Sequence, residues 1–420
     1  MNKKIKVLTI SDMPFSPSGV AGQTKYMIEA LLKTGKYQII SLGGAMKHRD
    51  YKPIQTDEWG KDWVTYPVDG YGDQDTIRSL MRSQRPDILW FMTDPRFWGW
   101  LWQIEHEIRP SVPMVYYHVW DNYPYPDFNG KYYRSNDLVA SISKVTDDIV
   151  KTVAPTVPSV YIPHTVDTDI FKKYSESDIE KVAEHGFGDA ADERFIFFWN
   201  NRNARRKQSG SLIYWFKAFL DKVGHDKARL LMHTEVHDPH GQDLQAIIES
   251  LGLVEGEVMF STNKVDPKTL ALLYNMADCT INISDAEGFG LATLESLACE
   301  TPIIVNMTGG LQEQVTDGEN WFGIGLEPTS KAVIGSQEIP YIREDRLSEE
   351  SVSDALLKIY NMSVEEREEL GRLGRGHVLK NYNFDDYCQK WDDTLTKVYN
   401  EHGSWENRKN YKAWELKKIA

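Results

Sequence analysis

Two acidic residues with glycines between them form the most specific chemical pattern in the chain. Glu287 and Glu295 stand eight residues apart, and Gly288 and Gly290 lie between them. The segment follows an apolar run typical of a strand and opens a helical pattern. Glycines let a backbone approach a ligand, N–H groups at a helix start attract anions, and carboxylates accept hydrogen bonds from hydroxyl groups. The pattern predicts a nucleotide-sugar site; the alternative is a helix with an acidic start and one solvated Glu.

A basic pair forms the second chemical pattern. Arg202 and Lys207 stand five residues apart, directly after the apolar run Phe195–Asn200. A leaving nucleoside diphosphate gains negative charge as its bond to the sugar breaks, and fixed cations stabilise that charge most in the transition state. The pair therefore predicts a diphosphate site, with a basic surface loop as the alternative.

The elements that must position these residues are strands alternating with helices, which indicates parallel sheets built from βαβ units. The first series has strands at 5–10, 38–42, 87–92, 112–117 and 138–142, with a helix at 23–33. The second has strands at 195–200, 228–233, 258–261, 280–283 and 303–305, with helices at 209–220, 243–251, 268–276 and 290–299. We expect an α/β fold of two doubly wound domains, with ligands at the carboxyl ends of the strands.

Composition shifts set the expected boundaries. Residues 1–165 form the first domain, 166–192 a linker region, 193–385 the second domain, and 386–420 a helical tail. The tail either packs on the second domain or crosses back to the first.

The acidic segment resembles the paired-glutamate motif of the retaining glycosyltransferases of family four. The loop Asn306–Glu313 and the turn Asp317–Asn320 resemble the elements that follow this motif in the family. The resemblance implies a GT-B fold, in which two Rossmann-like domains face a central cleft. It also implies that Glu287 contacts the donor sugar and Glu295 the ribose, with donor contacts also from Gly288, Phe289, Gly290 and Leu291.

The resemblance extends to the basic pair and to the first domain. It implies that Arg202 and Lys207 bind the diphosphate. Asn201 and Gln208 replace the glycines usual in the family, so the backbone path of the loop stays open.

In the first domain, Gly19 matches the family's glycine-rich loop, where Ser18 replaces a second glycine. His118 follows a strand and matches the active-site histidine, with a purely structural role as the alternative; His48 and Asp121 compete for polar roles.

Other patterns have plainer interpretations. Ile162–Phe171 resembles the interdomain linker, and we interpret Asp167 and Asp169 as part of it rather than as metal ligands. Neither a metal nor a cofactor is expected. An aromatic-rich stretch of the first domain forms either an acceptor platform or core packing: Trp90, Phe97, Trp98, Trp100, Trp102, Trp120, Tyr123 and Tyr125.

Composition excludes several classes of protein. The net charge of −14 argues against a chain that coats nucleic acid. The three cysteines are widely spaced and indicate neither a zinc site nor a disulfide framework. The amino-terminal apolar stretch is too short for a signal peptide and no run is long enough for a membrane span, so we expect a cytoplasmic protein.

The expected function is transfer of a sugar from a nucleoside-diphosphate sugar to a hydroxyl acceptor, with retention of configuration and without metal. The acceptor stays open among sugars, lipid-linked sugars, small molecules and modified nucleobases, as does the oligomeric state. The alternatives are a sugar-nucleotide epimerase or phosphorylase of the same fold, or a non-catalytic carbohydrate-binding protein.

Overall fold

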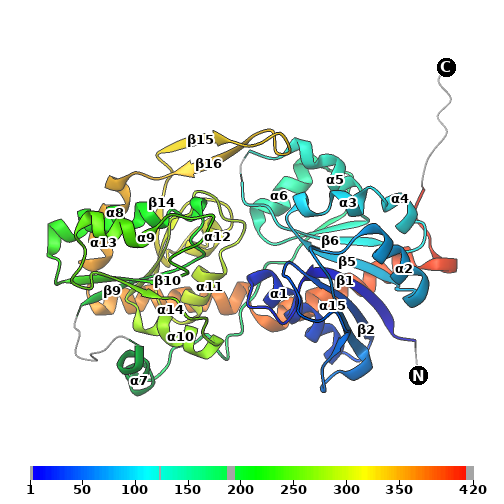
Figure 1. Ribbon diagram of the computed structural model, residues 1–420, viewed down its shortest axis with the longest axis horizontal. Helices are drawn as coiled ribbons and strands as arrows, with labels where there is room; N and C mark the ends of the chain where they lie inside the picture. Colours follow the sequence, from blue (N-terminus) through cyan, green and yellow to red (C-terminus); the bar gives the residue numbers. More distant parts are fainter. Residues whose placement is uncertain (1–2, 123, 187–193, 413–420) are drawn as a thin grey trace. The chain divides into compact units, whose positions relative to one another are not determined.

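A computed structural model describes residues 3–122, 124–186 and 194–412. They form two compact units (Figure 1). Unit 1 contains the chain up to Trp120, the segment Tyr125–His164 and the segment that begins at Asp385. Unit 2 contains Thr165–Phe384, and Asp121 and Asn122 group with it. Residues 187–192 of the predicted linker, 413–420 of the predicted tail and Tyr123 lie outside the described residues.

Unit 1 is built on an eight-stranded sheet in the order β3-β4-β2-β1-β5-β6-β7-β8. All neighbouring pairs are parallel except β3 and β4. Consecutive residues of the central strand, from Val7 to Asp12, are all buried, because helices cover both faces of the sheet. The strands are β1 (Ile5–Asp12), β2 (Tyr37–Gly44), β3 (Ile54–Gln55), β4 (Trp63–Pro67), β5 (Ile88–Thr93), β6 (Met114–His118), β7 (Leu138–Ser141) and β8 (Ser159–Tyr161).

The helices of unit 1 begin at side-chain caps in several places. Ser18, Asp73 and Ser143 each accept a hydrogen bond from a first-turn N–H group. The helices are α1 (Gly19–Lys33), η1 (Gly60–Asp62), α2 (Gln74–Gln84), η2 (Pro95–Phe97), α3 (Gly99–Trp102), α4 (Glu105–Ile108), η3 (Asp127–Asn129), α5 (Gly130–Arg134), α6 (Lys144–Val153), α15 (Phe384–His402) and η5 (Trp405–Asn407).

Unit 2 is built on a six-stranded parallel sheet in the order β11-β10-β9-β12-β13-β14. A hairpin of two further strands, β15 (Ser330–Ile334) and β16 (Ile342–Arg346), is separate from it. The sheet strands are β9 (Phe195–Asn200), β10 (Ala228–His233), β11 (Val258–Ser261), β12 (Cys279–Asn282), β13 (Ile303–Asn306) and β14 (Gly323–Leu326). The helices are α7 (Glu176–Gly186), η4 (Arg205–Lys207), α8 (Ser209–Val223), α9 (Leu244–Leu251), α10 (Pro267–Met276), α11 (Leu291–Ala298), α12 (Leu311–Val315), α13 (Glu349–Tyr360) and α14 (Val364–Asn381).

The last long helix, α15, belongs to the core of unit 1. The ring of Trp391 is fully buried and packs edge-on against Trp90 of β5 and Tyr117 of β6, with centroid distances of 5.8 and 4.9 Å. The hydroxyl of Tyr37 on β2 donates to Asp392 Oδ1 at 2.8 Å. Of the two placements that the sequence left open for the segment after residue 385, the described residues take the one on unit 1.

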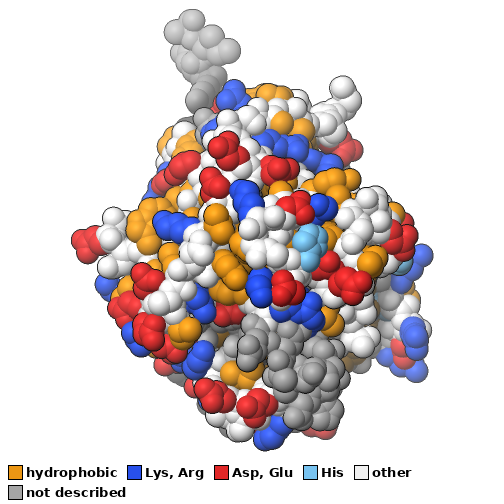
Figure 2. Space-filling view, turned by 90° about the vertical axis from the view of Figure 1, so that its left-hand side faces the viewer, with side chains coloured by type: hydrophobic (Ala, Val, Ile, Leu, Met, Phe, Trp, Pro, Cys, Tyr) orange, Lys and Arg blue, Asp and Glu red, His pale blue; other side chains and the backbone are white. Residues whose placement is uncertain are grey.

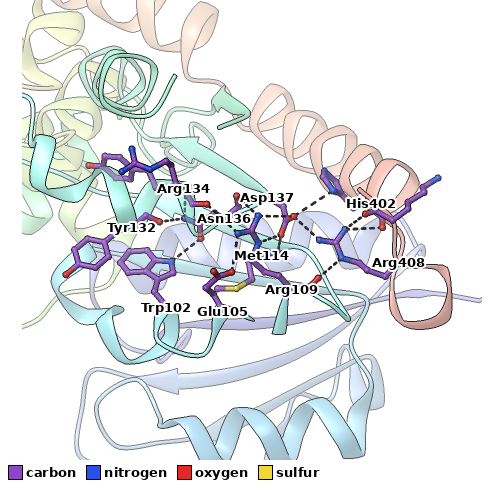
Figure 3. Close-up of polar contacts among 12 residues, drawn as sticks. Trp102, Glu105, Arg109, Met114, Tyr132, Arg134, Asn136, Asp137, His402 and Arg408 are labelled. Carbon is purple, nitrogen blue, oxygen red and sulfur yellow. Dashed lines mark hydrogen bonds and ion pairs between the residues drawn. The ribbon is translucent and has the colours of Figure 1, made fainter. Parts of the chain in front are cut away.

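The chain beyond α15 is held by a buried carboxylate (Figure 3). Asp137 is 5 % exposed and accepts from Arg109 Nε at 3.1 Å, from Arg408 Nη2 at 2.8 Å and from the N–H of Met114 at 2.9 Å. Two guanidinium groups and one backbone N–H thus satisfy a charge that burial alone would make costly.

The observed order of strands and helices confirms the predicted α/β fold class, and two details differ from the prediction. Helix α1 begins at Gly19 and not at residue 23, because Ser18 Oγ accepts from the N–H of Ala21 at 3.0 Å and caps the helix early. The strands β3, β4, β8 and β14 and the hairpin β15–β16 were not predicted, since they are short or lie at sheet edges. Among the described helices, none combines the length and apolarity needed to cross a membrane.

Candidate functional site

The acidic and basic segments of unit 2 lie at the same edge of its sheet. Strands β9 and β12 are parallel neighbours, with Thr280 opposite Phe198, so the loops that leave their carboxyl ends meet. The N–H of Asp285 donates to the carbonyl oxygen of Arg206 at 2.8 Å and joins the two loops directly. Strand order therefore brings together residues that are about eighty positions apart in the chain.

Lys207 and Glu287 form the centre of the site. Each is only 8 % exposed, and Lys207 Nζ donates to Glu287 Oε2. Burial, followed by the charge of Arg206, lowers the pKa of Lys207, and Glu287 opposes both effects. Burial alone would raise the pKa of Glu287, but Lys207 and Arg206 outweigh it and hold that pKa below its ordinary value. The carboxylate is thus kept ionised.

Arg206 completes the cationic side of the site, although the sequence analysis did not single it out. Its Nη1 donates to the carbonyl oxygen of Ala286 at 2.6 Å and lies 3.7 Å from Glu287 Oε2. Its Nη2 lies 3.2 Å from Asp121 Oδ2. The signal available in the sequence was the run of three cations, of which the short helix η4 directs the last two toward Glu287.

Gln208 gives the basic loop the backbone path that a glycine would allow. Its φ is +58°, in the left-handed region, at the position where the resembling family carries glycine. The side chain compensates for the unfavourable conformation: Nε2 donates to Asp285 Oδ2 at 2.5 Å and Oε1 accepts from Ser211 Oγ at 2.6 Å.

The glycine-rich acidic loop packs against the Gly-Gly turn after β13. A Cβ on Gly309 would overlap the carbonyl oxygen of Glu287, and one on Gly310 would lie 2.6 Å from the Cα of Phe289. The N–H of Gly310 donates to that same Glu287 carbonyl at 3.0 Å. Backbone approach this close requires glycine and fixes the loop that carries Glu287.

The other predicted donor-binding residues of this loop take different positions. Gly288 presents its N–H group, which donates to Asp121 Oδ1 at 2.9 Å. Gly290 adopts a φ of +93° and precedes α11, whose first residue is the partly exposed Leu291. Phe289 is 3 % exposed and packs on other residues of unit 2 rather than lining a surface.

Glu295 lies on α11 in a separate polar chain. Tyr274 Oη donates to Glu295 Oε2 at 2.8 Å, and Asn200 Nδ2 at the end of β9 donates to the same hydroxyl oxygen at 2.8 Å. Burial raises the pKa of Glu295 to about 7, although the hydrogen bond from Tyr274 opposes it. This carboxyl is therefore partly protonated near neutral pH, in contrast to Glu287.

Arg202 pairs with Asp238, whereas Lys207 pairs with Glu287. Its Nε donates to Asp238 Oδ2 at 2.5 Å and its Nη2 to Asp238 Oδ1 at 3.1 Å. The side chain of Arg202 is 61 % exposed. Asp238 thus occupies Nε and Nη2 of the guanidinium, and the phosphate contact that the resemblance implies for Arg202 stays a prediction.

Gly19 and His118 belong to unit 1. Gly19 is the first residue of α1, next to Ser18, whose hydroxyl donates to Asp12 Oδ2 at 2.6 Å. His118 is fully buried at the end of β6, with Nε2 and Tyr133 Oη 2.9 Å apart. Burial lowers the pKa of His118 to about 3, so the ring is neutral at ordinary pH. These contacts are those of a core residue, and a catalytic role for His118 stays a prediction.

Four of the seven described aromatic residues considered as a platform are core residues, and Trp100 and Tyr125 are partly exposed. Phe97 is 46 % exposed, whereas four tryptophans are buried: Trp90, Trp98, Trp102 and Trp120. Within the described ranges, no group of three or more His, Cys, Asp or Glu side chains is arranged to hold a metal ion. The chemistry at hand is that of two cations, the backbone N–H of Gly288 and carboxylates at a sheet edge, which suits an anionic ligand that also carries hydroxyl groups.

The comparison with protein families matches this part of the chain. Residues 188–375, less than half of the chain, match the family described as glycosyl transferases group 1. This segment includes both loops of the site and confirms the predicted resemblance.

The matches to individual relatives span less than half of each relative's length. A D-inositol 3-phosphate glycosyltransferase of Paenarthrobacter aurescens is 31% identical over 137 residues, 32% of this chain and 28% of the relative. A GDP-mannose-dependent alpha-(1-6)-phosphatidylinositol monomannoside mannosyltransferase of Mycolicibacterium smegmatis is 27% identical over 191 residues, 44% of this chain and 47% of the relative.

Solved structures are similar over nearly the whole chain. Sucrose-phosphate synthase of Thermosynechococcus elongatus has a TM-score of 0.74 at 16% identity and covers 95% of this chain and 100% of its own. HepE of Anabaena, solved in complex with UDP and glucose, has a TM-score of 0.68 at 15% identity and covers 94% and 100%. Likeness at this level of identity shows the fold, which is GT-B as predicted.

Proposed function

We propose that this chain is a glycosyltransferase that takes a sugar from a nucleoside-diphosphate sugar, held at the β9–β12 edge of unit 2, and transfers it to a hydroxyl acceptor. The observation that carries the proposal is the buried pair of Lys207 and Glu287, with Arg206 beside it and the backbone N–H of Gly288 in the same loop. The pair joins a group suited to a diphosphate to a group suited to sugar hydroxyls.

The chemistry assigned to the site is one substitution at the anomeric carbon. The bond between that carbon and the phosphate oxygen breaks, a bond to the acceptor oxygen forms, and the acceptor's proton passes to the leaving diphosphate. Lys207 and Arg206 stabilise the charge that develops on the phosphate. Glu287 orients a sugar hydroxyl. We propose retention of configuration, with the acceptor on the same face as the leaving group, and no requirement for metal.

The comparisons support this class of reaction. The family match spans both loops of the site, and the relatives named above are glycosyltransferases. HepE was solved with UDP and glucose, and the mycobacterial relative is GDP-mannose-dependent. UDP-glucose and GDP-mannose are therefore the first donors to test on this chain.

The test is calorimetric binding of UDP, GDP, ADP and CMP with and without EDTA, followed by a search for sugar transfer. We expect one nucleoside diphosphate to bind, to do so equally well in EDTA, and to bind at least tenfold more weakly to Lys207→Ala. The corresponding donor should then glycosylate an acceptor from a panel of sugars, lipid-linked sugars and small alcohols, with the product's anomeric configuration read by NMR.

Other outcomes separate the alternatives. Release of free nucleotide with inorganic phosphate as the required acceptor would indicate a phosphorylase, and conversion of the donor into its epimer would indicate an epimerase. Binding of carbohydrate with no nucleotide affinity would leave a carbohydrate-binding protein and overturn the proposal.

A further inference from the structure

The carboxylate of Asp121 contacts a backbone N–H group and a guanidinium group, the two kinds of hydrogen-bond donor that would bind a phosphate. Its Oδ1 accepts from the N–H of Gly288 at 2.9 Å, and its Oδ2 pairs with Arg206 Nη2 at 3.2 Å. Asp121 groups with unit 2, and the neighbouring Asn122 Nδ2 donates to the carbonyl oxygen of Arg343 in the same unit. The carboxylate is thus bound by a glycine-loop N–H and by a guanidinium group, as a bound anion would be.

With Asp121 in place, the charges of the site cancel. Arg206 and Lys207 supply two positive charges, and Glu287 and Asp121 supply two negative ones. Lys207 and Glu287 are nearly buried, whereas the side chains of Arg206 and Asp121 are 31% and 24% exposed. The Asp121 pair is therefore the more accessible of the two and the easier to open.

We infer that Asp121 is an internal anion that occupies a phosphate position of the donor site, so that a nucleoside diphosphate binds by displacing it. This inference rests on the proposed function, because it names how that same site is filled before the donor arrives. Displacement transfers the Gly288 N–H and Arg206 from the carboxylate to the phosphates, and affinity is reduced by whatever free energy the internal contacts hold. Asp121 therefore selects by affinity: the doubly charged diphosphate binds strongly enough to displace it, and anions that bind more weakly do not.

The experiment compares Asp121→Asn with Asp127→Asn by calorimetry, with UDP and GDP as probes. Asparagine preserves the shape of Asp121 but removes its charge, so the internal competitor is weakened. Asp127 is an exposed carboxylate six residues away, and its substitution changes the net charge by the same amount. We expect Kd for the nucleoside diphosphate to fall about tenfold in Asp121→Asn, as expected for one unit charge at a partly exposed site, and to be unchanged in Asp127→Asn.

Uridine and guanosine provide the readout that a merely structural role would not move. They lack phosphates, so their affinities should be equal in wild type and Asp121→Asn if the carboxylate competes with phosphate alone. A parallel gain for nucleoside and nucleotide would overturn the inference, as would an unchanged or higher Kd for the diphosphate. If no variant, wild type included, binds any nucleotide, the proposed function fails instead; if wild type binds through Lys207 and Asp121→Asn binds no better, only the inference fails.

Discussion

Glu287 and Glu295 show how neighbouring charges separate two buried carboxylates of one motif. Glu287 is charged because two cations face it, whereas Glu295 faces a tyrosine hydroxyl and burial lifts its pKa to about 7. Eight residues of sequence thus separate a carboxylate whose pKa is lowered from one whose pKa lies near neutral pH.

Lys207→Ala should lower turnover about 10²–10³-fold, because one fixed cation at the leaving diphosphate is lost. The measurement is the rate of sugar transfer with saturating donor, and thermal unfolding checks that the variant folds. Lys217→Ala is the matched control, since Lys217 pairs with Asp221 on the surface of α8. Equal turnover in both variants would show that Lys207 takes no part in the reaction.

Glu295 should give donor binding a pH dependence. If the ionised carboxylate accepts from the ribose hydroxyls, affinity for UDP-glucose or GDP-mannose rises about tenfold from pH 6 to 8 as a group with a pKa of about 7 loses its proton. The diphosphate of these donors does not titrate in this range. Glu295→Gln should bind with a flat profile, and a profile like that of wild type would contradict the assignment.

The same shift affects stability with a definite sign. The folded chain holds a proton on Glu295 up to about pH 7, whereas the unfolded chain releases it near the ordinary glutamate pKa of 4.5. The unfolded state therefore binds fewer protons between these values, and Glu295 makes the protein less stable as the pH rises from about 4.5 to 7.

At the scale of elements, loops from three neighbouring strands build the site. The loop after β9 carries the cations, the loop after β12 carries Glu287, and the turn after β13 supports it. Each of these loops contains a residue with left-handed backbone, namely Gln208, Gly290 and Gly309. Gln208 replaces a glycine through its side-chain hydrogen bonds, whereas Gly309 has no room for a side chain.

Gly309→Ala should be destabilising by about 2–4 kcal/mol, the sum of a left-handed conformation and a steric overlap with the carbonyl of Glu287. The measurement is the free energy of unfolding in urea, together with nucleotide affinity, which should fall as the Glu287 loop shifts. Gly252→Ala is the matched control: Gly252 has a φ of +67° and open space around it, so only the conformational part, about 1 kcal/mol, applies. Equal losses would show that the overlap is relieved at no cost.

At the scale of the whole molecule, the segment after residue 384 returns to unit 1 and is held at both ends. Trp391 fills the core beside β5 and β6, and Arg408 pairs with Asp137 beyond the helix (Figure 3). On the face displayed in Figure 2, acidic and basic side chains are interspersed and do not gather into one basic patch. This mixture fits a chain with a negative net charge.

Arg408→Ala should lower the free energy of unfolding by about 2–3 kcal/mol, because a charge-assisted hydrogen bond to a buried carboxylate is lost. The side chains of Arg408 and Asp137 are 4% and 2% exposed. Arg372→Ala breaks a pair with Glu369 in which both partners are more than half exposed, and should leave the free energy of unfolding nearly unchanged. Comparable losses in urea unfolding would mean that Arg408 does not anchor the segment.

The sequence by itself determined the alternation of strands and helices, because buried parallel strands need apolar runs and their helices need a periodic apolar face. It also predicted which loops lie together at the candidate site, since Lys207, Glu287, Gly288 and the Gly309–Gly310 turn are all expected at the donor site or beside it. Short edge strands escaped prediction, because four residues with one covered face leave little pattern.

Only the tertiary structure decided which charges meet. Strand order makes β9 and β12 neighbours and so brings Lys207 onto Glu287, and the turn of η4 directs Arg206 there while Arg202 pairs with Asp238. The same holds for Asp121, which reaches the N–H of Gly288 from a distant part of the chain. Contacts of this kind depend on distances of a few ångströms between segments far apart in sequence, and no local pattern encodes them.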